Sequence, residues 1–389
     1  MTRTKSYTLT DIANDVWLDS FSVGNDSLRL PTPHDWSIRK RTLRGGQRDG
    51  VDLIEVHNGA LSYPVLPTRG MGIWRGEYRG NFLGWHSPVH GPVHPKLVNL
   101  AERNGLGWLR GFDEWICRCG LASNGPPGVD NGTSLTLHGR IANLPANQVE
   151  VRVNIDPPYE LAVVGRVAET ELFGPHLHLT ATVTTIPGSG KLVIHDEVEN
   201  RSSSPAEMQL LYHCNIGPPF LEAGSRVMAP IREVAPLTPR AAEGIETLET
   251  YAGPTPGFTE QVYAYDLAAD GSEKTLVLLS NSTGDRGLAI RFSRRELPWF
   301  VVWKNTAPVE DGYVTGLEPS TNLPNFKAFE RQQGRVVKIP PGGKWHCQWS
   351  LEVFDTKPGV DHIVQEIATL QAKCRRVIHQ QPQARFSCV

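Results

Sequence analysis

Short stretches in which apolar and polar residues alternate recur along most of this chain, and they constrain its fold more than any other feature. Clear examples cover residues 149–155, 161–167, 176–183 and 191–200. Alternation with period two places every second side chain on the same face, which is typical of a half-buried β-strand. Glycine and proline, 37 and 30 residues in all, mark the turns between these stretches. Strands at such short spacing predict an all-β protein built as a large β-sandwich.

Three parts of the chain depart from this pattern. Residues 1–50 are polar and irregular, so we predict an irregular N-terminal segment, followed by a single β-sandwich domain over residues 51–389. Near the C-terminus apolar residues recur at helical spacing, which predicts one amphipathic helix at about 361–379, laid on the sandwich. Residues 81–131 show little periodicity and are rich in Trp, Gly, Pro and His. So long a segment without regular structure indicates a functional lining.

The charge balance bears on the class of partner. The chain has 39 Lys and Arg against 41 Asp and Glu, a net charge of −2. Proteins that bind nucleic acid or a membrane surface usually present a basic face, so we expect neither partner. The first residues lack the apolar stretch of a signal peptide, and no run approaches the ~20 apolar residues of a membrane span. Six irregularly spaced cysteines indicate reduced thiols, and these features together predict a cytoplasmic protein.

Three stretches carry residues suited to acid–base chemistry. A strand predicted over 313–317 leads into Glu318, and Pro319 stiffens the backbone beside this carboxylate. His213 follows one alternating stretch, and His138 follows another. Each of the three side chains is therefore predicted at the end of a strand, where a sheet holds it rigidly. A carboxylate and an imidazole with ordinary pKa values suit a general base and a general acid near neutral pH.

The order His138, His213, Glu318 resembles the galactose mutarotase (aldose 1-epimerase) superfamily. The second histidine follows the first by 75 residues, and the glutamate follows the second histidine by 105. Further stretches resemble the bacterial aldose 1-epimerase-like branch of this superfamily, at residues 67–72, 107–112, 137–145 and 318–322. The resemblance spans most of the chain. It implies a galactose mutarotase-like supersandwich and an enzyme that interconverts the anomers of a sugar.

The resemblance also implies roles for individual residues. It implies Glu318 as the general base, His213 as the general acid and His138 as a ligand of sugar hydroxyls. It implies no cofactor, a small-molecule sugar as the partner, and carbohydrate metabolism as the setting. The chemistry is the opening of a cyclic hemiacetal, rotation about the bond between C1 and C2, and closure on the other face of the aldehyde. The oligomeric state, the sugar and the anomer are not predicted.

Other site residues are candidates only. The family has a sugar-binding arginine upstream of the first histidine, for which Arg110 is the better candidate and Arg69 the second. It also has an acidic residue between the second histidine and the glutamate, and Glu260 stands at about that place. A glutamate in place of the usual aspartate leaves the hydroxyl preference open. Large aromatic rings can also stack on the C–H face of a sugar, and four tryptophans are candidates: Trp85, Trp108, Trp115 and Trp303.

Two alternative functions stay open. The same Glu and His could remove a proton from carbon, in a sugar lyase or isomerase with or without a metal, or the scaffold could bind carbohydrate without catalysis. The presence of both an acid and a base speaks against binding alone. Residues 85–95 contain His86, His90 and His94, but the two prolines and the glycine between these histidines argue against the helix that would align them. The cysteines at 117 and 119 form one Cys-x-Cys motif, and a single motif of this kind is weak evidence for a metal site. We therefore predict no metal site.

Overall fold

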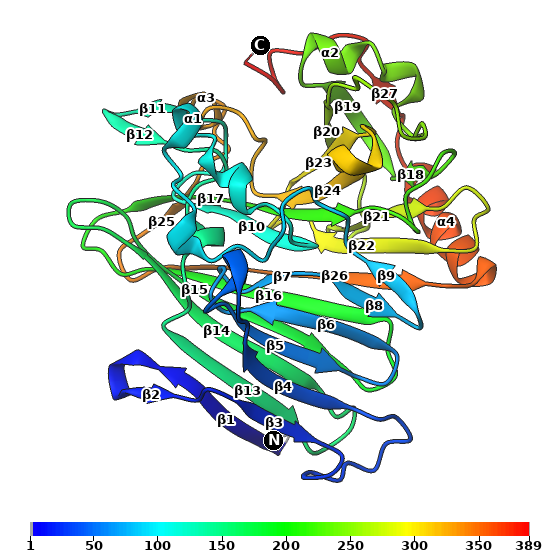
Figure 1. Cartoon of the computed structure of the whole chain (residues 1–389). Helices are drawn as coiled ribbons and strands as arrows, with labels where there is room; N and C mark the ends of the chain where they lie inside the picture. The colour runs from blue at the N-terminus through cyan, green and yellow to red at the C-terminus, as the bar shows by residue number, and fades with distance from the viewer. Residues whose placement is uncertain (1–2, 389) are drawn as a thin grey trace.

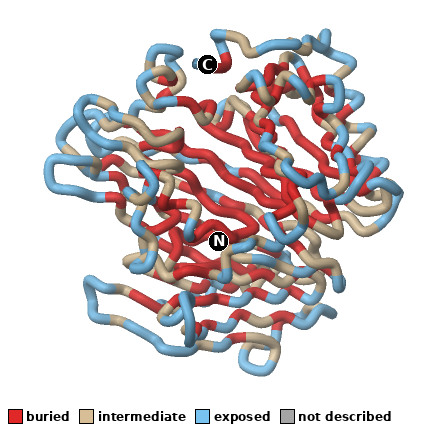
Figure 2. The backbone as a smooth tube through the Cα atoms, turned by 45° about the horizontal axis from the view of Figure 1, so that its top comes forward, coloured by how far each residue is buried: buried red, intermediate tan, exposed pale blue. Residues whose placement is uncertain are grey.

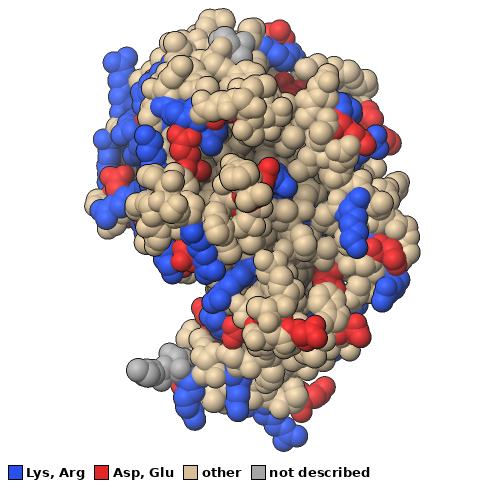
Figure 3. Space-filling view, turned by 90° about the vertical axis from the view of Figure 1, so that its left-hand side faces the viewer, with Lys and Arg blue, Asp and Glu red and all other residues tan. Residues whose placement is uncertain are grey.

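Two large β-sheets packed face to face make up most of the structure, a computed structural model that describes residues 3–388 (Figure 1). Every strand pair in the two large sheets is antiparallel except β19 with β27. The predicted all-β sandwich is thus confirmed. Acidic and basic side chains intermingle on the face shown in Figure 3, in keeping with the small net charge. Within residues 3–388 no helix is long and apolar enough to cross a membrane.

The smaller sheet has ten strands, in the spatial order β18 (Arg226–Met228), β21 (Lys274–Ser280), β22 (Gly287–Ser293), β26 (Lys344–Phe354), β16 (Lys191–Asn200), β15 (His176–Thr185), β14 (Leu161–Thr170), β13 (Gln148–Asn154), β1 (Thr4–Asp11) and β2 (Val16–Trp17). The larger sheet has fifteen strands. Twelve follow the order β27 (Val377–Ile378), β19 (Ile231–Pro236), β20 (Gln261–Leu267), β23 (Trp299–Asn305), β24 (Val314–Ser320), β17 (Ala206–Ile216), β10 (Ile116–Leu121), β7 (Gly72–Ile73), β6 (Leu61–Leu66), β5 (Asp52–His57), β4 (Ser37–Thr42) and β3 (Phe21–Gly24).

The remaining elements are short. Three further strands pair at the side of the larger sheet, namely β8 (Gly76–Tyr78), β9 (Asn81–Leu83) and β25 (Val337–Ile339). A separate hairpin consists of β11 (Gly128–Asp130) and β12 (Thr133–Leu135). The α-helices are α1 (Glu102–Gly105), α2 (Pro239–Ala242), α3 (Lys327–Gln332) and α4 (Lys357–Gln371).

The core lies between the two sheets, where alternate side chains of both meet. Figure 2 shows the buried residues along the central strands. It also holds a fully buried ion pair that joins the sheets. The Nε of Arg118 on β10 lies 2.5 Å from Asp196 Oδ2 on β16, and the Tyr212 hydroxyl donates to the same oxygen. Because Tyr212 points into this core, its neighbour His213 on β17 points out of the opposite face of the larger sheet. We call that opposite face the outer face.

The N-terminal segment differs from the prediction. Residues 1–50 were predicted to be irregular, but β1 pairs along its length with β13, and β4 pairs with β5. Strand β1 extends one edge of the smaller sheet, and β4 extends one edge of the larger sheet. The physical reason for the error is the edge position, because most side chains of β1 are exposed or half-buried and its sequence therefore lacks an apolar face.

The C-terminal helix is confirmed, but its bounds are shifted. Helix α4 begins at Lys357, with a proline in its first turn, and ends at Gln371 rather than near residue 379. Its buried face, which includes Ile363 and Ile367, packs on apolar residues of β21 and β22. The chain then continues into β27, which pairs in parallel with β19. The apolar residues at 377–378 serve that sheet edge and not the helix.

Candidate functional site

His213 and Glu318 lie opposite each other on neighbouring strands. Strands β17 and β24 pair Leu211 with Ser320 and Cys214 with Leu317, and this register sets His213 against Glu318. Both side chains therefore point to the outer face. The Nε2 of His213 lies 3.1 Å from Oε1 of Glu318, and the two residues are only 5% and 3% exposed. The sequence predicted each residue at the end of a strand, whereas both lie within their strands.

Two small local features make room for this pair. A Cβ at Gly316 would stand 2.3 Å from Glu318 Oε1 and 3.0 Å from the His213 ring, so only glycine leaves the carboxylate its place. Pro319 has no N–H to donate, and no pair forms between β17 and β24 at this position. Pro319 does pair with β23 on its other side. The proline therefore stiffens the strand beside Glu318 while the strand itself continues.

Asn215 determines which nitrogen of His213 carries a hydrogen. The side-chain amide of Asn215 donates to the carbonyl oxygens of Glu114 and His213, at 2.9 and 3.3 Å. Its Oδ1 is therefore the acceptor that faces His213 Nδ1 at 2.6 Å. Nδ1 must donate this hydrogen bond, so in the neutral ring Nε2 presents its lone pair to Glu318. The sequence analysis missed this role, although Asn215 stands two residues after the histidine, on the same strand face.

Burial sets the protonation of the pair. Burial lowers the pKa of His213 to about 3, and the nearby His138 adds to the effect. Burial also raises the pKa of the Glu318 carboxyl well above its usual range, with a further contribution from Glu260. Both shifts favour the uncharged forms, an imidazole and a carboxylic acid. Besides the Nδ1 hydrogen, the pair then carries a single proton, which is the number needed for one acid and one base.

His138 lies beside this pair in an unusual backbone conformation. Its φ is +57°, in the left-handed region, and its ring centroid lies 5.6 Å from that of His213. Nδ1 hydrogen-bonds to the carbonyl oxygen of Asn124 at 3.0 Å, so Nε2 is the nitrogen left to accept from a ligand. Asn124 in turn forms a reciprocal amide pair with Asn322, at 3.0 and 2.9 Å. Asn322 follows β24, so it ties the support of His138 to the strand that carries Glu318.

Aromatic rings from the segment predicted as a functional lining, 81–131, cover His213. Phe112 and Trp108 lie with ring centroids 5.0 and 6.3 Å from the His213 ring, and Trp303 on β23 lies at 5.4 Å. Trp108 also contacts His138, at 4.6 Å. Two of the four candidate tryptophans thus contact His213. Phe112 was not predicted.

The other two tryptophans lie elsewhere. Trp85 packs on Phe112, with ring centroids 5.0 Å apart, and belongs to the same buried apolar cluster. Trp115 is completely buried in the core between the sheets. The segment 81–131 also contains β10, a fully buried central strand that the sequence analysis did not identify. Its Cys117 pairs with His213, so the two nearby cysteines lie beneath the site, and all six cysteines of the chain are free.

The remaining candidates fall in three different environments. Glu260 is exposed, and its Oε2 accepts from Trp303 Nε1 at 2.5 Å, which places it at the site. Arg69 is 2% exposed and its guanidinium is already engaged, by Glu114 at 2.5 Å and by three further acceptors. Arg110 is exposed and pairs with Glu102. The structure thus places Glu260 near His213 and Glu318, whereas Arg69 is held in a buried ion pair with Glu114.

The histidine-rich segment 85–95 is divided among several contacts. His86 stacks on Phe82, with ring centroids 4.9 Å apart, and His94 Nδ1 accepts from the backbone of Lys96. The backbone N–H of His94 donates to the carbonyl oxygen of Gln47 at 2.8 Å. In the part of the chain that the structure describes, no three His, Cys, Asp or Glu side chains gather as a metal site.

Comparisons with known proteins place the chain in a family. Residues 48–353 match the family described as "Domain of unknown function (DUF4432)". A crystal structure of a Klebsiella pneumoniae protein, provisionally assigned as an aldose 1-epimerase, is 36% identical, with a TM-score of 0.95 over 98% of this chain and 99% of that one. No curated protein matches the chain.

More distant structures share the fold. A galactose mutarotase-like protein from Clostridium acetobutylicum is 16% identical, with a TM-score of 0.54 over 82% of this chain and 98% of that one. A galactose 1-epimerase from Lactobacillus acidophilus is 10% identical, with a TM-score of 0.52 over 87% of this chain and 99% of that one. The chain therefore belongs to the family of unknown function DUF4432 and has the galactose mutarotase-like fold.

Proposed function

We propose that this protein is an aldose 1-epimerase, in which Glu318 and His213 interconvert the anomers of a sugar. The observation that carries the proposal is the contact of 3.1 Å between His213 Nε2 and Glu318 Oε1, in a buried pair that holds one proton. The names of the Klebsiella and Lactobacillus proteins support the same reaction class. The aromatic rings of Trp108 and Trp303 supply apolar faces on which a sugar ring can stack.

The reaction needs one base and one acid at the same time. Transfer of the shared proton from Glu318 to His213 Nε2 produces a carboxylate and an imidazolium without changing the net charge of the pair. Glu318 then accepts the proton of the anomeric hydroxyl while His213 donates its Nε2 proton to the ring oxygen. The bond between C1 and the ring oxygen breaks, and C1 becomes a carbonyl carbon. Rotation and the reverse steps close the ring on the other face.

The neighbouring residues orient the sugar and the acid. Asn215 holds the Nδ1 hydrogen of His213, so that Nε2 is the nitrogen that exchanges the proton. His138 Nε2 accepts from a sugar hydroxyl, because its Nδ1 is engaged by the backbone. Glu260 accepts from a second hydroxyl at the exposed side of the site. The low exposure of the pair keeps bulk water from competing for its proton.

Anomer exchange followed by NMR tests the proposal. Aldohexoses and aldopentoses would be dissolved as single anomers, and the approach to equilibrium compared with and without the protein. We expect acceleration for at least one sugar, and loss of that acceleration in His213→Asn, which cannot donate the proton. If no sugar equilibrates faster with the protein, or if His213→Asn retains full activity, the proposal is wrong. Formation of a double bond or of a ketose in the same spectra would instead indicate a lyase or isomerase.

A further inference from the structure

A hollow lies where residues 44–48 meet residues 74–75 and 90–91. It has a volume of about 600 Å³ and is lined by Arg44, Arg48 and Arg75, together with Trp74, His90 and adjacent small residues. No carboxylate lines it. The hydrogen bond from the backbone of His94 to Gln47 holds the first and last of these segments together. Three arginines from two segments, Arg44 and Arg48 from one and Arg75 from the other, thus converge on one hollow.

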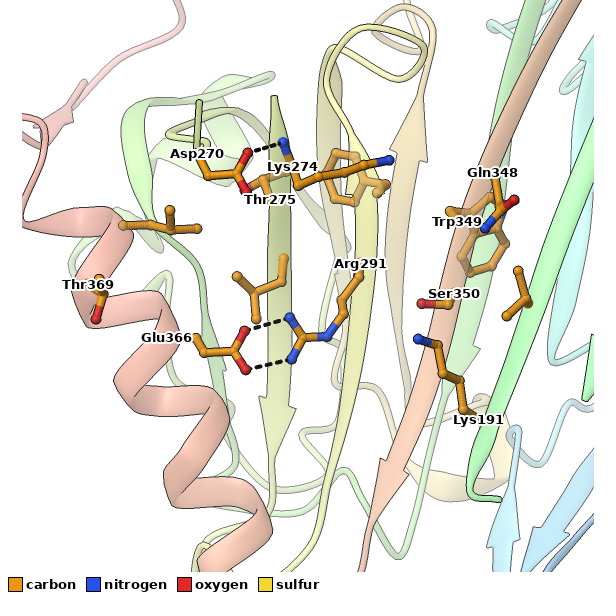
Figure 4. Close-up of a pocket in the computed structure, with 14 residues that line it drawn as sticks. Lys191, Asp270, Lys274, Thr275, Arg291, Gln348, Trp349, Ser350, Glu366 and Thr369 are labelled. Carbon is orange, nitrogen blue, oxygen red and sulfur yellow. Dashed lines mark hydrogen bonds and ion pairs between the residues drawn. The ribbon is translucent and has the colours of Figure 1, made fainter. Parts of the chain in front are cut away.

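These arginines lack counterions. Among residues 3–388 none of the three forms an ion pair, and the Arg75 guanidinium lies over the Trp74 ring, 3.8 Å from its centroid. The nearest carboxylate in the sequence, Asp49, accepts from the backbone of Gly45. A hollow beside α4 provides the contrast (Figure 4). There Arg291 is held by both carboxylate oxygens of Glu366, at 2.6 and 2.9 Å.

A smaller pocket of about 200 Å³ continues this hollow, since both are lined by Trp74, Arg75, His90 and Gly91. It adds the aromatic rings of Phe82, Trp85 and His86. Phe82 and His86 stack almost in parallel, at an interplanar angle of 7°. Flat rings of this kind provide apolar contact for the C–H groups of a sugar. We call the hollow and this pocket together the arginine groove.

Asp113 lines the pocket with an oxygen that has no partner. Its Oδ2 accepts from Trp74 Nε1 at 2.8 Å, whereas its Oδ1 is buried and makes no hydrogen bond within the described residues. The residue is only 6% exposed. Burial raises the pKa of the Asp113 carboxyl to about 8, with Glu114 as a second cause. A carboxyl that keeps its proton at neutral pH does not repel an anion, and its free oxygen can bond to a hydroxyl.

We propose that the arginine groove is a second saccharide site, specific for an acidic sugar. The guanidinium groups of Arg44, Arg48 and Arg75 bind the anionic group, the aromatic rings contact the sugar ring, and Asp113 bonds to a hydroxyl. Arginine suits this role because its planar fork matches carboxylate, sulfate and phosphate oxygens. The site is distinct from the His213–Glu318 pair, because neither residue lines the arginine groove.

Calorimetric titration of the full chain at low salt tests the proposal. The probes are glucuronate, glucose 6-phosphate, inorganic phosphate and glucose. We expect both acidic sugars to bind at least tenfold more tightly than glucose and than inorganic phosphate, and to bind more weakly at high salt. Inorganic phosphate that binds as tightly as the acidic sugars would show a simple anion site and overturn the proposal, as would glucose binding as tightly as glucuronate.

A double variant with a matched control locates the binding. Arg44→Gln with Arg48→Gln should weaken both acidic sugars at least tenfold, whereas Arg295→Gln should not, because Arg295 is an exposed arginine without an ion pair outside the groove. Arg75→Lys keeps the charge but removes the fork, and should weaken binding on its own if the double variant fails to fold. Unchanged affinity in a folded variant overturns the proposal. Anomer exchange of a neutral sugar should persist in the double variant, so the two proposals can fail independently.

Discussion

The proposed catalytic pair and the arginine groove are linked by the contact of Phe112 with Trp85, and they handle charge in opposite ways. His213 and Glu318 are buried, and the shifts of their pKa values remove charge from both. The three arginines of the groove stay charged and have no counterion among the described residues. Burial favours neutral groups that exchange one proton, whereas an accessible, uncompensated charge attracts an anion. Neighbouring regions of one protein can therefore have unrelated chemistry.

The sharpest test of this contrast is Glu318→Gln. The amide keeps the size of the carboxyl but cannot accept the anomeric proton, so we expect anomer exchange to fall by about 10²–10⁴-fold. The affinity for glucuronate in the arginine groove should not change, because Glu318 does not line the groove. Rate measurements by NMR and calorimetric titration of the same preparation check both halves. A variant that lost both properties together would show that there is one site and not two.

The second test concerns the buried arginine near both regions. Arg69 pairs with buried Glu114 and also donates to the carbonyl oxygens of Val93 and Gly111. Arg69→Leu leaves Glu114 buried without its counterion, which costs about 3–5 kcal/mol in the free energy of unfolding. Chemical denaturation measures this cost. The control is Arg110→Leu, whose exposed ion pair contributes about 0–1 kcal/mol.

The same two variants separate the two candidates for a sugar-binding arginine. If Arg110 binds the substrate, Arg110→Leu should raise KM for the best sugar without changing stability. The main effect of Arg69→Leu should be a lower free energy of unfolding. A stable Arg69→Leu protein with only a raised KM would contradict the structural role assigned to Arg69 here.

The smallest expected effect is on pH dependence. An ordinary histidine titrates near pH 6.5, but burial lowers the pKa of His213 to about 3. Because kcat/KM reports groups of the free enzyme, it should show no His213 inflection near pH 6.5. It should fall in strongly acidic solution, where His213 gains a proton, and again as the pH rises through the raised pKa of Glu318. A clear inflection near pH 6.5 that disappears in His213→Asn would contradict the protonation state described for the pair.

The free energy of unfolding should also depend on pH, in the direction set by the pKa shifts of His213 and Glu318. The folded pKa of His213 lies below its unfolded value, so unfolding binds a proton between about pH 3 and 6.5, and its contribution to stability is lost as the pH falls. Glu318 has the opposite sign, because its folded pKa is raised and its contribution is lost as the pH rises. His213→Asn should therefore reduce the slope of stability against pH by about 1.4 kcal/mol per pH unit in that window. Denaturation at several pH values measures the slope.

Strands and helices were predictable where a local sequence pattern indicates them. The alternation of β13 to β16 is local, and the sequence predicted these strands well. The strands β1 and β4 lie near or at sheet edges and lack a clear apolar alternation, and β10 is buried on both faces, so neither case shows period two. Helix α4 was predicted from its apolar spacing, but its end depends on a pairing with β19 that no local pattern reveals.

The candidate site divides in the same way. The types and order of His138, His213 and Glu318 were visible in the sequence, because a resemblance of this kind depends only on residue identity and spacing. The role of Asn215, the reciprocal pair of Asn124 with Asn322, and the shifted pKa values depend on packing between distant segments.

The sequence by itself thus determined the β-sandwich and the chemical groups available for acid–base catalysis, since periodicity and residue type are properties of the chain. The tertiary structure alone decided that His213 faces Glu318 at 3.1 Å and that Arg44, Arg48 and Arg75 share one hollow. The physical reason is that register and loop packing arise from contacts between segments far apart in the sequence. Burial, which sets the charge of each group, exists only after those contacts form.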